Sequence, residues 1–271
     1  MTNHDPVSDH YHHADLGSAI LGALKAAGKD INALTLDDLM LVDEFHTRGR
    51  AGTIELADLA ALTGAAHVLD VGCGIGGPSR YLARTFRCRV TGLDLTWEFC
   101  RVAGMLARRT GLADRVTYLR GNALALPFAD QTFDVAWSQN SVMNIADRNR
   151  LYGEIRRVLK PAGRYVFSDV VAGPNQPLHL PVPWARDPSI SFLLSAERTS
   201  QCLAAAGLRT LVLEDRTGDA LANARARTSA PEPLLGVHIL LGEDFPAMAE
   251  NMFRNFVEER IGLVQGVAAC K

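Results

Sequence analysis

Acidic and glycine residues form the most specific chemical pattern in this sequence. The stretch "VLDVGCGIGG" (68–77) places Asp70 two positions before Gly72, and Gly74 and Gly76 follow at alternate positions. Glycines at such a bend let a ligand approach the backbone closely. A carboxylate at the start of the bend would repel a pyrophosphate and attract a cationic group. The pattern therefore predicts that these four residues bind a nucleoside that carries positive charge and no phosphate.

Two later motifs extend this prediction to a particular cofactor. Asp94 ends the run "RVTGLDL", where a carboxylate can accept hydrogen bonds from both ribose hydroxyls, and Leu95 can pack on an adenine face. An NAD site would also place an acid here, so Asp94 alone does not discriminate. In "GNALALPF", Asn122 and the backbone of Ala123 can meet the adenine edge. S-adenosylmethionine has a cationic sulfonium and amine, two ribose hydroxyls and no phosphate, and it is the cofactor that the sequence predicts.

The run "FDVAWSQN" (133–140) and the residues after it predict the boundary between cofactor and methyl acceptor. We expect Gln139 to contact the cofactor and Asn140 and Met143 to bind the acceptor. Asn144 is a candidate catalytic residue. The positions follow from the rule that ligands bind beyond the carboxyl ends of parallel strands.

Residues far from these motifs are expected to complete the acceptor pocket. His46 lies in "VDEFHTRGRAGT", a glycine-punctuated segment. If the acceptor must lose a proton, His46 or a residue of "DEF" (43–45) is the first candidate for a general base. Tyr11 near the N-terminus and Trp184 in the proline-rich stretch 171–192 are expected to contact the acceptor. The histidines of "HYHH" (10–13) have no acidic or cysteine partner at ligand spacing, so no metal site is predicted.

Strands and helices that alternate along the chain are expected to position these residues. Short apolar or β-branched runs alternate with helical patterns from 66 to 170, which favours parallel strands with helices on both faces. Residues 1–62 are expected to form an N-terminal helical cap, and 63–271 the cofactor-binding domain. Within that domain we expect an inserted lid at about 171–194, because long loops are usually functional, and a helical part at about 217–260.

Five motifs in this order resemble a known family. "VLDVGCGIGG", "GLDL", "GNALALPF", "FDVAWSQN" and "EIRRVLKPAGRYVFSD" look like the successive motifs of the class I S-adenosylmethionine-dependent methyltransferases. The chain is most similar to the small-molecule branch with the sarcosine and dimethylglycine N-methyltransferases and the quinone and tocopherol C-methyltransferases. The resemblance implies an α/β fold with a doubly wound, seven-stranded, mostly parallel Rossmann-like sheet, whose antiparallel last strand is "IGLVQGVAAC". Asn122, where many members carry Asp, and Ala162, where Gly is common, depart from the pattern.

Composition narrows the partners and the compartment. The formal charge of −2 and the polar N-terminus predict a cytoplasmic protein that binds neither nucleic acid nor membranes, and the oligomeric state stays open. The five cysteines are scattered and odd in number, which suits a reducing compartment. The predicted function is methyl transfer to a small molecule through N, O or C. The alternatives are an NAD(P)-dependent oxidoreductase on a similar sheet and a non-catalytic cofactor-binding protein.

Overall fold

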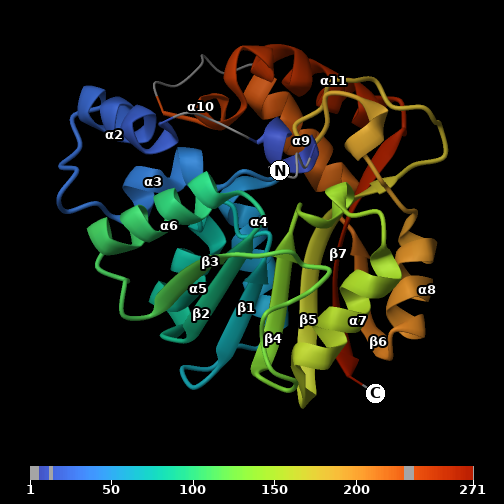
Figure 1. Ribbon diagram of the computed structural model, residues 1–271. Coiled ribbons are helices and arrows are strands. Elements are labelled where there is room, and N and C mark those ends of the chain that lie inside the picture. Colours follow the sequence, from blue (N-terminus) through green and yellow to red (C-terminus); the bar gives the residue numbers. More distant parts are fainter. Residues whose placement is uncertain (1–5, 12–14, 229–234, 271) are drawn as a thin grey trace, which may run out of the picture.

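A seven-stranded sheet forms the centre of the molecule. The computed structural model describes residues 6–11, 15–228 and 235–270. The strands lie in the order β3-β2-β1-β4-β5-β7-β6, and β7 is antiparallel to both of its neighbours (Figure 1). Their bounds are β1 His67–Val71, β2 Arg89–Asp94, β3 Val116–Arg120, β4 Phe133–Gln139, β5 Leu159–Ala172, β6 Leu208–Asp215 and β7 Ile261–Cys270. The predicted mostly parallel sheet with an antiparallel last strand is confirmed.

Helices cover both faces of this sheet. One face packs against α4 (Gly49–Ala60), α5 (Gly77–Phe86) and α6 (Trp97–Arg109), and the other against α7 (Arg148–Val158) and α8 (Ala196–Ala205). The interior strand β1 supplies both cores, because successive side chains of a strand point to opposite faces. Val68 packs in the core under α4 and α5, whereas Leu69 packs in the core under α7 and α8.

Further segments lie above the carboxyl ends of the parallel strands (Figure 1). The N-terminal part contributes α1 (Pro6–His10), α2 (Leu16–Ala26) and α3 (Leu36–Asp43). The C-terminal part contributes α9 (Thr217–Thr228), α10 (His238–Leu241), η3 (Gly242–Asp244) and α11 (Phe245–Val257). The proline-rich stretch between β5 and α8 contains η2 (Pro188–Ile190) and packs with α11 in an apolar cluster. Together these segments enclose the edge of the sheet where the predicted site residues lie.

Two side chains hold the proline-rich stretch in place. Asn255 of α11 is fully buried, and its amide pairs with the backbone N–H and C=O of His179, each at 2.9 Å. Arg148 at the start of α7 donates to the carbonyl of Phe192 at 2.8 Å. These bonds satisfy backbone groups that would otherwise lack partners in an irregular segment.

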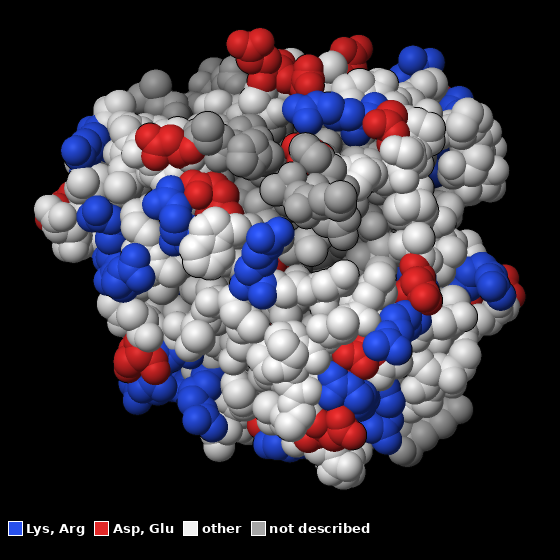
Figure 2. Space-filling view, in the orientation of Figure 1, with Lys and Arg blue, Asp and Glu red and all other residues white. Residues whose placement is uncertain are grey.

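Charges of both signs are interspersed on the face of the molecule in Figure 2. None of the helices in the described residues is long and apolar enough for a membrane crossing.

Candidate functional site

A cavity of about 370 Å³ opens at the carboxyl ends of β1, β2 and β4. The predicted site residues that line it are Tyr11, His46, Asp70, Gly72, Gly74, Asp94, Leu95, Asn122, Ala123, Gln139, Asn140 and Asn144. They come from several separate parts of the chain, so the fold brings together residues that the sequence analysis could only assign one by one.

The glycine bend shapes one wall of the cavity. Gly72 and Gly74 have φ angles of 73° and 53°, in the left-handed region that favours glycine. A Cβ on Gly72 would lie 2.3 Å from the Cβ of Ser141, whereas a Cβ on Gly74 would meet no atom within 4 Å. Gly72 therefore allows close packing of the loop after β4, and Gly74 leaves its backbone open to a ligand.

Asp70 is a buried carboxylate at the base of this wall. Its Oδ2 accepts a hydrogen bond from the Ser79 hydroxyl at 2.5 Å, and the residue is 2% exposed. Burial raises the pKa of Asp70 to about 7, with a further rise from the charge of Asp94, against the hydrogen bond from Ser79. A cationic group in the cavity would stabilise the ionised carboxylate, because burial disfavours the charged form only while it lacks a counter-charge.

Asp94 is anchored by the backbone. Its Oδ2 accepts from the N–H of Gly74 at 2.9 Å, and its Oδ1 accepts from the N–H of Thr96 at 2.8 Å. Burial raises the pKa of Asp94, and these backbone donors oppose the rise. Each oxygen keeps a second lone pair, so the carboxylate can still accept from two ligand hydroxyls while its orientation is held.

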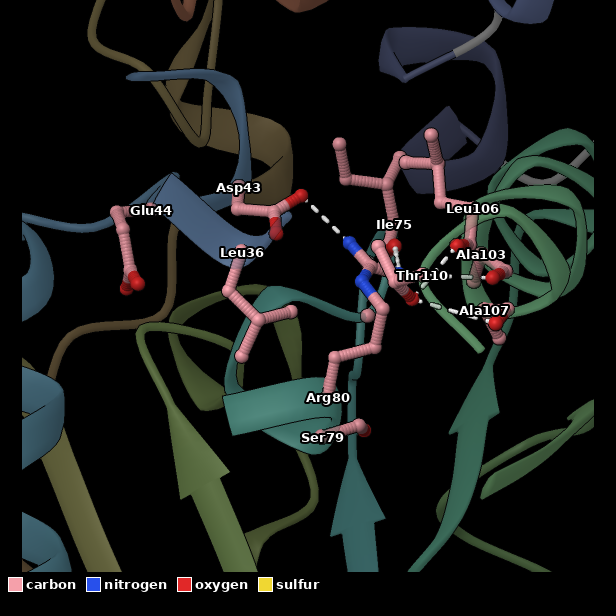
Figure 3. A network of polar contacts seen from close by, with 12 residues as sticks. Leu36, Asp43, Glu44, Ile75, Ser79, Arg80, Ala103, Leu106, Ala107 and Thr110 are labelled. Carbon is pink, nitrogen blue, oxygen red and sulfur yellow. Dashed lines mark hydrogen bonds and ion pairs between the residues drawn. The ribbon is translucent and has the colours of Figure 1, made fainter. Parts of the chain in front are cut away.

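A buried ion pair ties α3 to the glycine bend. Arg80 of α5 donates to Asp43 Oδ1 at 2.5 Å and to the carbonyl of Ile75 at 2.7 Å, and both charged side chains have no exposed surface. Figure 3 shows the Asp43 carboxylate directed toward Arg80, whereas the side chain of Glu44, its neighbour in sequence, lies apart from that pair. Burial raises the pKa of Asp43 to about 6, and the charge of Arg80 limits that rise. Asp43 also lines the cavity, so this pair fixes the N-terminal part against the predicted cofactor wall.

Glu44 belongs to a second buried polar cluster, whose other members are His46, Thr53 and Gln139. Glu44 Oε2 lies 2.8 Å from His46 Nε2 and accepts from the Thr53 hydroxyl at 2.8 Å, while Arg50 donates to Oε1. Burial acts to raise the pKa of Glu44, but the hydrogen bond from His46 and the charges of His46 and Arg50 lower it to about 2. The ionised carboxylate therefore holds the proton of His46 on Nε2. The other ring nitrogen, Nδ1, lies 3.2 Å from Gln139 Nε2.

Asn144 connects three segments around the cavity. Its Nδ2 donates to the carbonyls of Trp184 and Ile190, at 2.7 and 2.8 Å, and its Oδ1 accepts from the Tyr11 hydroxyl at 3.1 Å. Both amide hydrogens are thus engaged by the proline-rich stretch. Asn144 therefore has no free N–H group for the catalytic role expected of it, and the geometry favours a positioning role.

Asn140 keeps an unsatisfied polar atom at the cavity. Its backbone φ is 50°, and its Oδ1 is buried without a hydrogen-bond partner among the described residues. Buried polar atoms without partners are rare in folded proteins. The orphaned oxygen therefore fits a wall that contacts a polar ligand.

Three predicted residues do not line the cavity. Gly76 lies at the start of α5, and a Cβ on it would lie 2.3 Å from the Tyr118 hydroxyl. This glycine therefore makes room for the side chain of Tyr118. Met143 and Trp184 are each 2% exposed and pack in the apolar cluster beneath the proline-rich stretch. The Trp184 indole N–H donates to Ser191 Oγ at 3.0 Å, which satisfies it within the protein. These placements do not support the expected contacts of the three residues with cofactor or acceptor.

Asn122 lines the cavity but has a local partner. Its Oδ1 accepts from the N–H of Leu124 at 2.8 Å, which makes a turn of the kind asparagine favours. Phe99 and Ser141 also line the cavity and were not predicted from the sequence. Phe99 lies in the first turn of the helix after "GLDL", which was a usable signal, whereas Ser141 had none. Asp43, from the "DEF" segment, lines the cavity as well.

Comparisons with known proteins agree with this geometry. Residues 69–167 match the family model described as "Methyltransferase domain". A glycine/sarcosine/dimethylglycine N-methyltransferase of Actinopolyspora halophila is 35% identical over 136 residues, which cover 50% of this chain and 23% of that protein. The matched parts span less than half the length of the first curated relatives.

Solved structures extend the likeness to the whole fold. A geranyl diphosphate C-methyltransferase from Streptomyces coelicolor A3(2) superimposes with a TM-score of 0.73 at 20% identity, covering 100% of both chains. A protein described as the [4+2]-cyclase SpnF superimposes with a TM-score of 0.63 at 25% identity, covering 93% of both chains. Because a cyclase shares the fold, the fold alone does not establish the reaction.

The sheet order and the glycine bend agree with the family match. Residues 69–167 form a methyltransferase domain within this sheet.

Proposed function

We propose that this protein transfers the methyl group of S-adenosylmethionine to a small-molecule acceptor. The main support for this proposal is that Asp70 and Asp94 line the same cavity, beside the backbone of Gly74, which is open to a ligand. Asp70 supplies a buried negative charge for a cationic group, and Asp94 supplies acceptors for ribose hydroxyls. A pyrophosphate would meet two carboxylates at the same wall, which disfavours the oxidoreductase alternative.

The residues of this chain act by holding and enclosing the reactants. The sulfonium of the cofactor supplies an activated methyl group, so the protein mainly has to align the acceptor and exclude water. Alignment of this kind can contribute roughly 7 to 11 kcal/mol. Val7 and Tyr11 from the N-terminal part and Phe192 from the proline-rich stretch form walls of the cavity. We propose that residues 1–62 act as a cap and 171–194 as a lid over this site.

The charge of the cavity favours certain acceptors. Four aspartates line it, Asp43, Asp70, Asp94 and Asp147. The neighbouring geranyl diphosphate enzyme is described with a diphosphate ligand and Mg²⁺. Such an anion would be repelled by the aspartate wall of the present chain unless a cation came with it. We therefore propose a neutral or amine-bearing acceptor without phosphate, methylated on N, O or C.

Other features support a small-molecule enzyme of a reducing compartment. Five cysteines are free, and the structure pairs none of them in a disulfide among the described residues. Four of the arginines between 84 and 120 donate to backbone carbonyls, for example Arg84 to Thr110 and Arg115 to Arg87. These bonds favour structural roles over binding of nucleic acid, and we propose a cytoplasmic location.

The proposal is tested by cofactor binding and turnover. We expect isothermal titration to show binding of S-adenosylmethionine and S-adenosylhomocysteine and none of NADH. With the methyl-labelled cofactor, an acceptor panel of amines, phenols and prenyl compounds should yield labelled product. Binding of NADH alone would overturn the assignment, and cofactor binding with no product from any acceptor would favour the non-catalytic alternative.

A further inference from the structure

Tyr118 of β3 supports the glycine bend from the side opposite the cavity, which it does not line. Asp70 of β1 pairs in register with Gly92 of β2, and Gly92 pairs in register with Tyr118. The three residues therefore form one row on one face of the sheet. A Cβ on Gly92 would lie 2.5 Å from Tyr118 Cδ1 and 2.8 Å from Cys73 Sγ. The tyrosine ring and the sulfur of the bend thus fill the space that the missing side chain leaves.

The hydroxyl of Tyr118 reaches the last glycine before α5. It donates to the carbonyl of Gly76 at 3.2 Å, and the same carbonyl accepts from the backbone N–H of Arg80 at 3.0 Å. Burial raises the pKa of Tyr118, and the charge of Arg80 opposes the rise. The hydroxyl therefore stays a neutral donor, and Tyr118 supports the bend both near Cys73 and at Gly76.

Gly74 lies between these two supports, and its backbone is the part of the bend that is open to a ligand. The N–H of Gly76 donates to the carbonyl of Cys73 at 2.9 Å, which closes a turn around Gly74. The N–H of Gly74 donates to Asp94 Oδ2. A loop that adopts several conformations binds its ligand with an affinity reduced by the fraction of the competent one. Support by Tyr118 should keep the bend in the conformation that binds.

We propose that Tyr118 is a positioning residue for the cofactor, which raises cofactor affinity by holding the glycine bend without touching the cofactor. Gly92 belongs to the same arrangement, because a side chain at its position would displace the tyrosine ring. The inference rests on the proposed function, because it concerns binding of the same cofactor.

Two substitutions of Tyr118 separate the hydroxyl from the ring. The measurement is isothermal titration with S-adenosylhomocysteine at pH 7.5, after urea unfolding has shown that each variant is folded. Tyr118→Phe keeps the ring and should weaken binding about 2- to 10-fold, because one hydrogen bond to the bend is lost. Tyr118→Leu also removes the ring and should weaken binding about 10- to 100-fold. That range corresponds to a bend that is competent about a tenth to a hundredth of the time.

A matched control is available on the other face of the sheet. Tyr165 of β5 is fully buried, its hydroxyl lies 2.7 Å from Ser138 Oγ, and it does not line the cavity. Tyr165→Leu should lower the urea midpoint but bind S-adenosylhomocysteine within twofold of the wild type. This comparison separates support of the bend from a general loss of stability.

Gly92→Ala tests the same contact from the other side. In the wild type the added methyl group meets the tyrosine ring, and binding should weaken at least about tenfold. In the Tyr118→Leu background the ring is gone, so the same change should cost less than about threefold. Residues in contact have non-additive effects of this kind. Additive effects on affinity would contradict the proposal.

Hydrogen–deuterium exchange of the free protein gives a readout that needs no ligand. Exchange within residues 70–80 should be faster in Tyr118→Leu than in the wild type and unchanged in Tyr165→Leu, because only the first variant loosens the bend. Equal exchange in the two variants would overturn the proposal.

The remaining outcomes are also decisive. Wild-type affinity in folded Tyr118→Leu, or an equal weakening in Tyr165→Leu, would overturn the proposal. If Tyr118→Leu does not fold, wild-type affinity in both Tyr118→Phe and Gly92→Ala would overturn it. Failure of the wild type to bind S-adenosylhomocysteine would instead overturn the proposed function, while the exchange measurement would still decide whether Tyr118 holds the bend.

Discussion

The Tyr11 hydroxyl donates to Asn144 Oδ1 at 3.1 Å and so connects the N-terminal segment to the loop after β4. The aromatic ring of Tyr11 lies between Phe45 and Phe99, with centroid distances of 6.2 and 5.8 Å. Burial raises the pKa of Tyr11, and the charge of Asp94 raises it further. Tyr11 therefore remains a neutral donor near the proposed cofactor, and its bond to Asn144 helps to close the cavity.

Asn144→Asp should lower stability more than Tyr11→Phe does. The aspartate keeps the shape of asparagine but cannot donate to the carbonyls of Trp184 and Ile190. We expect a loss of about 2 to 4 kcal/mol in the free energy of unfolding, because two buried carbonyls lose their donor and face a carboxylate. Tyr11→Phe should cost about 1 kcal/mol. Urea unfolding measures both.

Limited proteolysis supplies the structural readout for these variants. Cleavage within 171–194 should become faster in Asn144→Asp and stay near the wild-type rate in Tyr11→Phe. If both variants unfold at the same urea concentration as the wild type, Asn144 does not hold the proline-rich stretch in place.

Asp94→Ala should weaken binding of S-adenosylhomocysteine by about 1 to 3 kcal/mol, because charge-assisted hydrogen bonds to the ribose are lost. Isothermal titration measures the change. Asp134→Ala is the control, since Asp134 lies at the opposite end of the sheet and pairs with Lys160 at 2.7 Å. That control should bind like the wild type. Unchanged affinity in Asp94→Ala would remove Asp94 from the cofactor site.

Binding of the amine end should depend on pH through Asp70. The pKa of Asp70 in the free protein is raised to about 7, whereas a bound cation requires the ionised form. Below about pH 7 a proton must be released on binding, so affinity should fall by up to about tenfold per pH unit as the pH decreases. Above that value it should level off. Titrations with decarboxylated S-adenosylhomocysteine isolate this effect from the carboxylate.

Asp70→Asn should remove that pH dependence and weaken binding at pH 8. The same raised pKa has an opposite consequence for stability. A carboxyl whose folded pKa is raised contributes stability that is lost as the pH rises through the folded value. Asp70→Asn should therefore stabilise the free protein above about pH 7, by at most about 4 kcal/mol. A retained pH profile in this variant would assign the titration to another group.

Arg80→Met should destabilise the protein by about 3 to 5 kcal/mol at pH 8, because Asp43 is left buried and unpaired. The loss should be smaller at pH 5.5, where the carboxyl, whose pKa is already raised to about 6, can take up a proton. The double variant Asp43→Leu with Arg80→Met should recover much of the loss. Urea unfolding at the two pH values checks each expectation.

An exposed ion pair provides the comparison for the buried one. Arg101 pairs with Glu98 on the surface of α6, and its side chain is 47% exposed. Arg101→Met should change stability by less than about 1 kcal/mol, because solvent screens such pairs. If Arg80→Met and Arg101→Met lowered the free energy of unfolding equally, burial of the Asp43 and Arg80 pair would not increase its contribution to stability.

The strands, their class of sheet and the glycine bend could be predicted from the sequence. Alternating runs and the glycine bend are local signals, since side-chain period and backbone freedom follow from neighbouring residues. Asp70, Gly74 and Asp94 could therefore be assigned from their local motifs. Met143 and Trp184 could not be placed in this way, because a bulky apolar residue near a site packs as readily in a core as in a pocket.

The pairing of charged groups around the cavity could be seen only in the tertiary structure. Asp43 and Glu44 are adjacent in sequence, yet one pairs with Arg80 of α5 and the other with His46 and Arg50. Gln139 is far from His46 along the chain and meets it only where the end of β4 reaches α4. Electrostatic interactions depend on distance and burial, and neither is encoded in the spacing of residues along the chain.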